Sequence, residues 1–348
     1  MSLPTGIRSY NYAQDMAVFR TRAHWVWLGV LLALLFTGPL YWGGELLSVA
    51  NLIGITIIAA TGLNILTGYC GQLSIGHAGF IAVGAYAAAI ITKRFELPFL
   101  VGLIGAGGVA GLVGVVFGIP SLRVKGFYLA ISTIAAQFII IWVINHWTGI
   151  TGGFNGMSVP PVQIGRLTLV TQASQFYLIM IIVITVVFLA KNLSRTRAGR
   201  AFVAIRDNDL AAQVMGISLF RYKLLAFFIG CFLAGIAGSL FAHWTGFLNA
   251  ENFTMMDSIL YVGIIIIGGL GTTIGPIFGV LVIRWLQWFI MKISPVIEAL
   301  FPNLPAGFTA GIGPMVFGIA IILFLIFMPR GLAHRWSLLR ASYRLWPF

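Results

Sequence analysis

Hydrophobic residues along this chain gather in long blocks that short polar segments separate. Several blocks run for about 18 residues or more without a charge, which is the length a helix needs to cross a bilayer. The pattern predicts an all-α, polytopic helical membrane protein with about ten transmembrane segments. The predicted spans cover residues 25–42, 47–66, 78–92, 99–119, 127–146, 175–190, 224–243, 258–283, 285–301 and 311–328.

The polar segments between these blocks carry an uneven distribution of charge. Basic residues concentrate in residues 1–24, 191–223 and 330–348, whereas most acidic residues fall in the opposite loops. Cytoplasmic loops of membrane proteins are enriched in Lys and Arg, so we expect these three segments to be cytoplasmic and residues 147–175 to form an extracytoplasmic loop. Residues 25–329 then form the transmembrane domain, with Arg284 at a cytoplasmic junction between two spans.

Lys93 and Arg94 are the exception to this distribution, because alternation places them outside. One explanation is a re-entrant or broken hairpin over residues 67–92, which leaves the number of spans open.

Composition agrees with a membrane protein: of the 348 residues, 59% are hydrophobic and 8% are charged. The 21 basic and 8 acidic residues leave a net charge of +13, which in a soluble protein would indicate a nucleic-acid partner. In a membrane protein the preference of basic residues for the cytoplasm explains this excess, so we expect no nucleic acid. Cys70 and Cys231 lie in apolar surroundings and are expected to be buried small residues.

Glycine-rich clusters interrupt the hydrophobic blocks. Residues 68–86 read GYCGQLSIGHAGFIAVGAY, and residues 268–276 read GGLGTTIGP. Backbone that leaves the helix at membrane depth is tolerated only inside protein or beside a water-filled cavity, so both clusters predict broken or re-entrant elements along a route through the bilayer. Residues 102–118 carry seven glycines, including Gly107 and Gly111, and predict close helix packing inside the bundle.

Polar side chains follow the first cluster and the span before it. Candidate residues of a transport path are Thr61, Asn64, Gln72, Ser74 and His77. Two interpretations stay open, because a polar residue inside a membrane marks either a solute path or a hydrogen bond between helices.

The sequence has neither the coupling carboxylate of an ion-driven carrier nor the phosphate-binding loop of an ATPase. No carboxylate lies in the middle of a predicted span, where an ion-coupled carrier usually keeps one. There is also no G-x-x-x-x-G-K-[ST] phosphate-binding loop, so any use of ATP must come from a partner. The spacing of His, Cys and carboxylates predicts no metal site, and no cofactor is expected.

Residues 191–223 have the features of a docking segment. Two short helices are expected near 198–206 and 209–215, separated by capping residues and ended by Gly216. Leu210, Val214 and Ile217 form an apolar edge at helical spacing, which fits a groove of another protein. An equally open interpretation is that the segment lies on the membrane surface, where its arginines contact anionic lipid headgroups.

Together these segments resemble a known family, the permease subunits of branched-chain amino acid ABC importers, of the LivM type. The resemblance lies in residues 68–86, 122–133, 145–156, 199–238 and 267–276, in that order. It implies a transport subunit of the bacterial inner membrane rather than an enzyme. Its implied partners are a second homologous permease, two cytoplasmic ATP-binding subunits that hydrolyse ATP, and an extracytoplasmic solute-binding protein.

The resemblance also gives the docking segment a role. Residues 211–216 are similar to the Ala-Ala-x-x-x-Gly part of the loop that couples importer permeases to their ATPases, although Asp209 and Leu210 stand where that pattern has a glutamate, and no Leu-Pro follows. The coupling residues it implies are Arg200, Arg206, Asp209, Leu210, Ala211, Ala212 and Gly216.

The implied function is import of branched-chain amino acids by alternating access. Alternatives remain at this stage: a permease of the same family for urea, short-chain amides or another small solute, an ion-coupled secondary carrier, or a passive channel.

Overall fold

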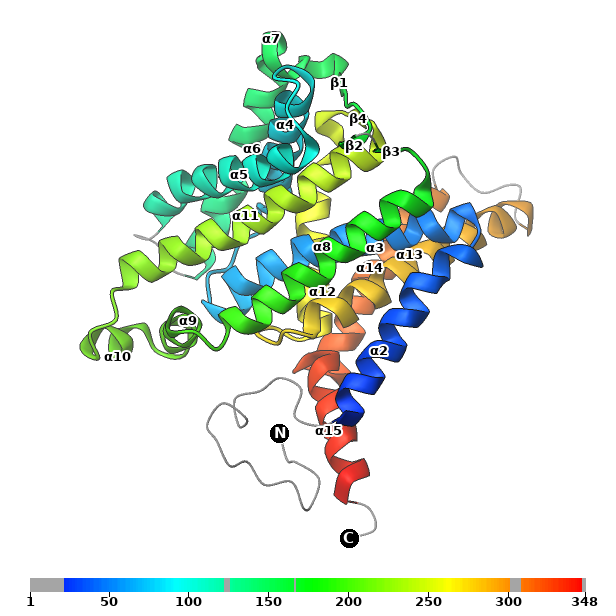
Figure 1. The fold of residues 1–348 in the computed structure, drawn as a ribbon. Helices are drawn as coiled ribbons and strands as arrows, with labels where there is room; N and C mark the ends of the chain where they lie inside the picture. The colour runs from blue at the N-terminus through cyan, green and yellow to red at the C-terminus, as the bar shows by residue number, and fades with distance from the viewer. Residues whose placement is uncertain (1–21, 122–125, 166, 301–307, 346–348) are drawn as a thin grey trace.

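A computed structural model describes residues 22–121, 126–165, 167–300 and 308–345, and helices make up most of it (Figure 1). The long helices are α2 (Arg22–Thr37), α3 (Gly44–Leu63), α4 (His77–Lys93), α5 (Phe99–Ser121), α6 (Phe127–His146), α8 (Gln172–Leu193), α11 (Leu219–Thr245), α12 (Met255–Gly268), α13 (Gly275–Leu300), α14 (Phe308–Phe327) and α15 (Gly331–Leu345). Shorter elements are η1 (Gly38–Leu40), η2 (Asn64–Tyr69), α7 (Thr148–Thr151), η3 (Gly153–Asn155), β1 (Met157–Ser158), β2 (Val162–Ile164), β3 (Leu167–Leu169), α9 (Arg197–Asp207), α10 (Asp209–Val214), β4 (Phe247–Leu248) and η4 (Ala250–Asn252).

The polytopic helical class is confirmed, but the predicted number of ten spans is not. In the described residues, 7 helices are long and apolar enough to cross a membrane, or up to 8 if the bent pair Gly313–Phe327 and Gly331–Ser342 forms one span. Two further apolar helices, Trp25–Leu40 and His77–Lys93, are shorter than a full crossing. The prediction counted these short helices as spans because hydropathy does not reveal how deep a helix begins.

The predicted interruption of the span over residues 258–283 is present, because the chain breaks between α12 and α13. Gly269 and Gly271 adopt positive φ angles of 115° and 72°, which only glycine enters at low cost, and the helix cannot continue through them. Pro276 lies in the first turn of the next helix, where its missing N–H costs nothing. Arg284, predicted at a junction between spans, therefore lies inside α13.

Helices α5 and α11 pack closely over glycine, as the sequence predicts. A Cβ on Gly107 would lie 2.8 Å from the Phe232 ring, and one on Gly111 would lie 2.8 Å from the Phe228 ring. The backbones therefore approach to a distance that larger residues would prevent. Only this face of α5 is buried, however, since Leu112 on another face is 63% exposed.

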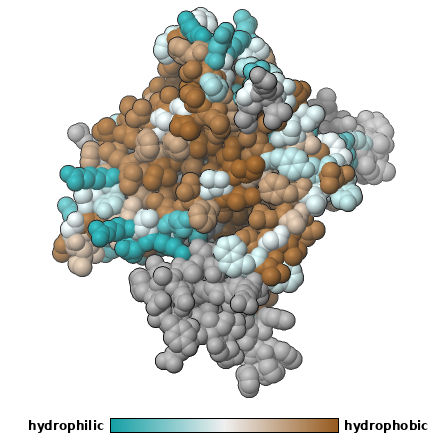
Figure 2. Space-filling view, viewed as in Figure 1, coloured by the Kyte–Doolittle hydropathy of each residue, from teal (hydrophilic) through white to brown (hydrophobic). Residues whose placement is uncertain are grey.

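The two ends of the helical bundle differ in structure. At one end α7, η3 and the short strands form an ordered loop in which β1 pairs with β4 and β2 pairs with β3, both antiparallel. At the other end lie α9 and α10, and the 27-residue helix α11 runs between the two ends (Figure 1). Figure 2 shows a broad hydrophobic band between hydrophilic residues at the two ends, which is the pattern of a membrane-spanning protein.

Candidate transport path and coupling surface

The first glycine-rich cluster begins where α3 leaves regular helical geometry. Its last turn, η2, is π-helical, and Gly71 follows with a positive φ of 72°. The Gln72 backbone N–H still donates to the Leu66 carbonyl at 3.1 Å, after which the chain runs without helix until α4 begins at His77. Because His77 Nε2 lies 3.0 Å from the carbonyl of Ala59, well inside α3, helix α4 begins within the bundle rather than at its surface. The predicted broken element is therefore present.

The two glycine-rich clusters, far apart in sequence, meet in space. Asn64 connects them: its Nδ2 donates to the Thr272 carbonyl at 2.8 Å, and its Oδ1 accepts from the Gly271 N–H at 2.9 Å. The Tyr69 hydroxyl lies 3.0 Å from Thr273 Oγ1 and adds a second connection. A Cβ on Gly68 would collide with the Gly271 backbone, so glycine at this position permits the contact.

The carboxamide of Asn64 is expected to stabilise this junction. In Asn64→Asp the Nδ2 donor becomes a carboxylate oxygen that faces the Thr272 carbonyl, so we expect a loss of about 1–3 kcal/mol in stability. Thr61→Val is the control, because Thr61 Oγ1 donates only to the Ile57 carbonyl of its own helix. Thermal unfolding in detergent measures both variants, and equal stability of N64D and T61V would contradict this role.

The other candidate path residues lie in the interior of the bundle. Thr61 and Gln72 are each 3% exposed, and Ser74 and His77 are fully buried. Gln72 Oε1, Ser74 Oγ and His77 Nδ1 have no hydrogen-bond partner among the described residues. Buried polar atoms usually have hydrogen-bond partners. At these three atoms, solvent, solute or a second chain can supply the missing partner.

Sequence reasoning missed the hydrogen bonds that hold the start of α4. The Ala78 N–H donates to Ser258 Oγ at 2.9 Å, and Ser258 donates in turn to Gln137 Oε1 at 2.7 Å. Thr133 Oγ1 accepts from the Ile75 N–H at 3.0 Å. A helix that begins inside the bundle needs hydrogen-bond partners for its first N–H groups. Polar residues in the neighbouring spans were the sequence signal that could have indicated these partners.

The two short helices predicted in residues 191–223 are present as α9 and α10, with bounds close to those expected. Thr196 caps α9 by accepting from the Gly199 N–H, and Asn208 caps α10 by accepting from the Ala211 N–H at 3.0 Å. Gly216 ends the segment with a φ of 83°. Phe202, which is 1% exposed, anchors α9 in the core. The segment is thus a fixed part of the structure.

The exposed apolar edge of this segment differs in one position from the predicted edge. Leu210 is 66% exposed and Val214 is 87% exposed, as a docking edge requires. Met215, at 82%, is exposed in place of Ile217, which is half-buried. Ala211 is exposed, but Ala212 is buried at 4%, so Ala212 packs within the chain.

Arg206 joins the docking segment to both glycine-rich clusters. Its Nη1 donates to the Gly68 carbonyl at 3.0 Å, and a Cβ on Gly271 would lie 2.7 Å from the same nitrogen. Asp207 accepts from the other side of the guanidinium at 2.9 Å. Arg206 therefore links α9 to the junction of the two clusters.

The remaining charged residues of the segment make contacts within this chain. Arg200 is exposed and donates through Nη1 to the Arg195 carbonyl at 2.7 Å. Asp209 lies 3.9 Å from Lys223 Nζ on α11. These contacts connect α9 and α10 to the residues that precede and follow them in the chain.

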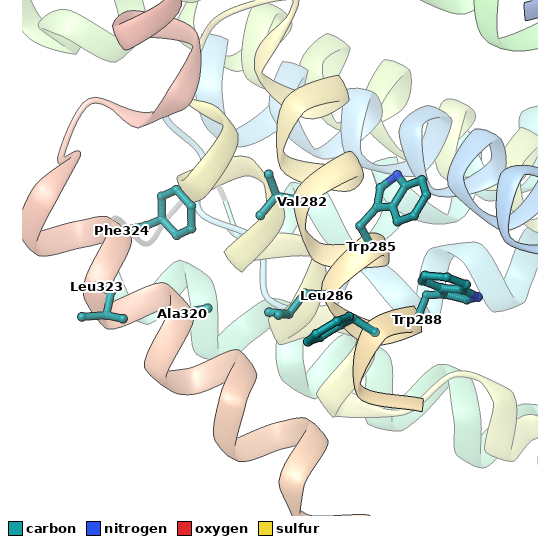
Figure 3. A pocket seen from close by; sticks show the side chains of 8 residues that line it. Val282, Trp285, Leu286, Trp288, Ala320, Leu323 and Phe324 are labelled. Carbon is teal, nitrogen blue, oxygen red and sulfur yellow. The ribbon is translucent and has the colours of Figure 1, made fainter. Parts of the chain in front are cut away.

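The structure has one cavity beside this junction and one groove elsewhere on the bundle. A cavity of about 590 Å³ lies between the 271–274 loop, the end of α8 and α15, and its lining includes Tyr69, Lys191 and Arg340. A groove of about 500 Å³ lies between α13 and α14, where Val282 and Leu286 are on the side of α13 nearer to Leu323 and Phe324 (Figure 3). The lining of this groove is apolar, so it offers no partner for the charged ends of a zwitterion.

The apolar spans, the broken helices and the exposed amphipathic segment define a multi-pass membrane protein of the transporter class. Residues 45–327 match the family model described as the branched-chain amino acid transport system / permease component, and the chain belongs to this family.

Named relatives agree with this assignment. The chain is 32% identical to the high-affinity branched-chain amino acid transport system permease protein LivM of Escherichia coli, over 74% of this chain and 66% of that protein. It is 33% identical to LivM of Salmonella typhimurium, over 71% and 64%. A probable LivM of Methanocaldococcus jannaschii is 26% identical over 80% and 90%. The match thus spans just under two thirds of the first two relatives. No solved structure matches the chain.

Proposed function

We propose that this chain is the permease subunit of an ATP-driven importer for branched-chain amino acids. With a second, homologous permease it forms a transmembrane path that opens alternately to the two sides of the membrane. Two ATP-binding subunits bind at α9 and α10, and a solute-binding protein delivers the amino acid at the opposite end. The family of the chain and the names of its relatives support this proposal.

One observation carries the mechanism. Leu210 and Val214 extend an apolar edge from the bundle, and Arg206 in the preceding helix bonds to the Gly68 carbonyl where the broken helices meet. A partner that moves this edge therefore moves the junction. ATP shifts such an equilibrium only as far as its binding favours one conformation of the whole assembly.

The proposal also sets the orientation of the chain. Because ATP-binding subunits are cytoplasmic, α9 and α10 face the cytoplasm, and the ordered loop with β1–β4 faces outward. Both termini are then cytoplasmic, in the inner membrane of a bacterium. The many basic residues of 191–223 agree with this orientation.

Arg206→Gln tests the mechanical connection. The variant loses a charge-assisted bond worth about 1.5–3 kcal/mol, so we expect ATP-driven leucine uptake to fall about tenfold or more while ATP hydrolysis continues. The importer is purified through a tag on this chain, reconstituted with its binding protein and assayed for both activities.

Arg197→Gln is the matched control, because Arg197 is an exposed arginine at the start of the same helix. We expect near-normal uptake from it. Wild-type uptake by R206Q, or an equal loss in the two variants, would contradict the role of Arg206. Absence of ATP-driven amino acid uptake by the wild-type assembly would contradict the proposed function.

A further inference from the structure

Arg284 is a charged residue at the centre of the bundle. It lies more than two helical turns from either end of α13, and its guanidinium contacts Thr56, which stands at the middle of the 26-residue span Gly44–Tyr69. A charge at this depth costs about 2.5–3.5 kcal/mol by insertion measurements. Charged residues are retained at this depth mainly where they serve a path or a ligand.

The groups that accept hydrogen bonds from Arg284 are polar but carry no negative charge. Its Nε and Nη2 donate to Thr56 Oγ1 at 3.0 and 2.8 Å, and its Nη1 donates to Gln287 Oε1 at 2.8 Å. Tyr261 also lies close to the guanidinium. In the part of the chain that the structure describes, no carboxylate lies within ion-pair distance of this guanidinium.

The geometry leaves Arg284 able to accept an anionic ligand. Each of its two Nη atoms carries two N–H groups, and the bonds to Thr56 and Gln287 use one on each. The side chain is also partly exposed, although it is far from both ends of the helix. Because a partly exposed arginine does not face hydrocarbon at this depth, its open side faces a polar path or another protein chain.

The candidate path lies next to this arginine. Tyr261 lies close to Arg284 on one side and to His77 on the other. Its ring packs edge-on against His77, with 6.0 Å between the ring centroids. Arg284 therefore stands one side chain away from the start of α4, where the polar atoms without partners gather.

We propose that Arg284, with Thr56 and Gln287, forms a transient binding site for the carboxylate of the transported solute at the middle of the membrane. This inference rests on the proposed function, which supplies an amino acid as the solute. Guanidinium groups bind carboxylates through paired N–H donors, with a geometry that lysine does not reproduce. Neutral partners hold Arg284 weakly enough for a passing carboxylate to compete and leave.

Arg284→Gln in the reconstituted importer tests this site. We expect the initial rate of leucine uptake to fall about 10- to 100-fold, which corresponds to the loss of charge-assisted hydrogen bonds. ATP hydrolysis stimulated by the loaded binding protein should continue, so the amount of leucine moved per ATP should fall. A purely structural role would lower both activities together.

Two further variants complete the test. Lys292→Gln removes a cation from the outer part of the same helix, where Lys292 pairs with Glu45 at 2.6 Å, and it should transport nearly as the wild type does. Arg284→Lys keeps the charge but loses the paired donors, so we expect about tenfold slower uptake. R284K carries the test if R284Q does not assemble.

Three results would overturn this site. Wild-type uptake by R284Q would show that no carboxylate binds there. Loss of the second permease from both Arg284 variants, seen by mass spectrometry of the intact complex, would show that Arg284 binds a group of that subunit instead. Normal uptake by R284K would assign the effect to charge alone. A wild-type importer that does not transport amino acids would instead overturn the proposed function.

Discussion

Replacing Leu210 and Val214 together by glutamate is expected to abolish ATP-driven uptake while the chain remains folded in the membrane. The two side chains are 66% and 87% exposed, so polar replacements remove little from the core. In the assembled importer the same side chains would enter an apolar groove of the ATP-binding subunit. Burial of two unpaired carboxylates there costs several kcal/mol, which lowers coupled transport at least 100-fold.

The matched control is the double variant Leu210→Met/Val214→Met, which keeps the edge apolar and should retain most of the uptake. Uptake, ATP hydrolysis and co-purification of the ATP-binding subunits are measured for both double variants. Ala212 is a poorer site for such a test, because it is only 4% exposed and a charge there would disturb α10 itself. Normal uptake by the double glutamate variant would contradict the proposed coupling surface.

Gly84→Ala is expected to have the largest effect on the stability of the bundle. A Cβ on Gly84 in α4 would lie 2.5 Å from the carbonyl oxygen of Gly235 in α11, and backbone cannot move aside as a side chain can. We expect a loss of about 1–3 kcal/mol or more from overpacking. The variant should show a lower midpoint of thermal unfolding in detergent and a lower yield from membranes.

Gly108→Ala is the control for this substitution. Gly108 also lies within a helix, α5, but no atom lies within 4 Å of the Cβ that alanine would add. The gain in helix propensity is then the main effect, and it stabilises by up to about 1 kcal/mol. If G84A unfolds at the same temperature as G108A, the close contact between α4 and α11 is not essential.

The fold class was predictable because it depends on composition and on long apolar runs. The break at residues 269–274 was predicted from its glycine cluster, but the position where the next helix ends was not. The charge of Arg284 was taken as the end of a span, whereas Thr56 and Gln287 accommodate it inside one. Hydropathy records the cost of a charge but not the partners that a distant helix supplies.

The candidate path was predictable in its residue types but not in their roles. Asn64 and Thr61 were both candidate path residues, but Asn64 bonds to the 271–272 backbone and Thr61 bonds to its own helix. The partner of Asn64 lies about 200 positions away in the sequence, whereas the partner of Thr61 lies four positions away. The sequence around the two residues does not distinguish these two cases. The docking segment was predicted better, because its caps and its apolar edge are local features.

A photo-activated cross-linking residue at Val214 tests whether α10 binds an ATP-binding subunit. The cross-link is formed in native membranes, the chain is purified through its tag, and mass spectrometry identifies the attached protein. We expect a cytoplasmic subunit with the G-x-x-x-x-G-K-[ST] phosphate-binding loop, attached next to an apolar groove. Cross-links only to lipid or to another copy of this chain would contradict an ATP-driven permease.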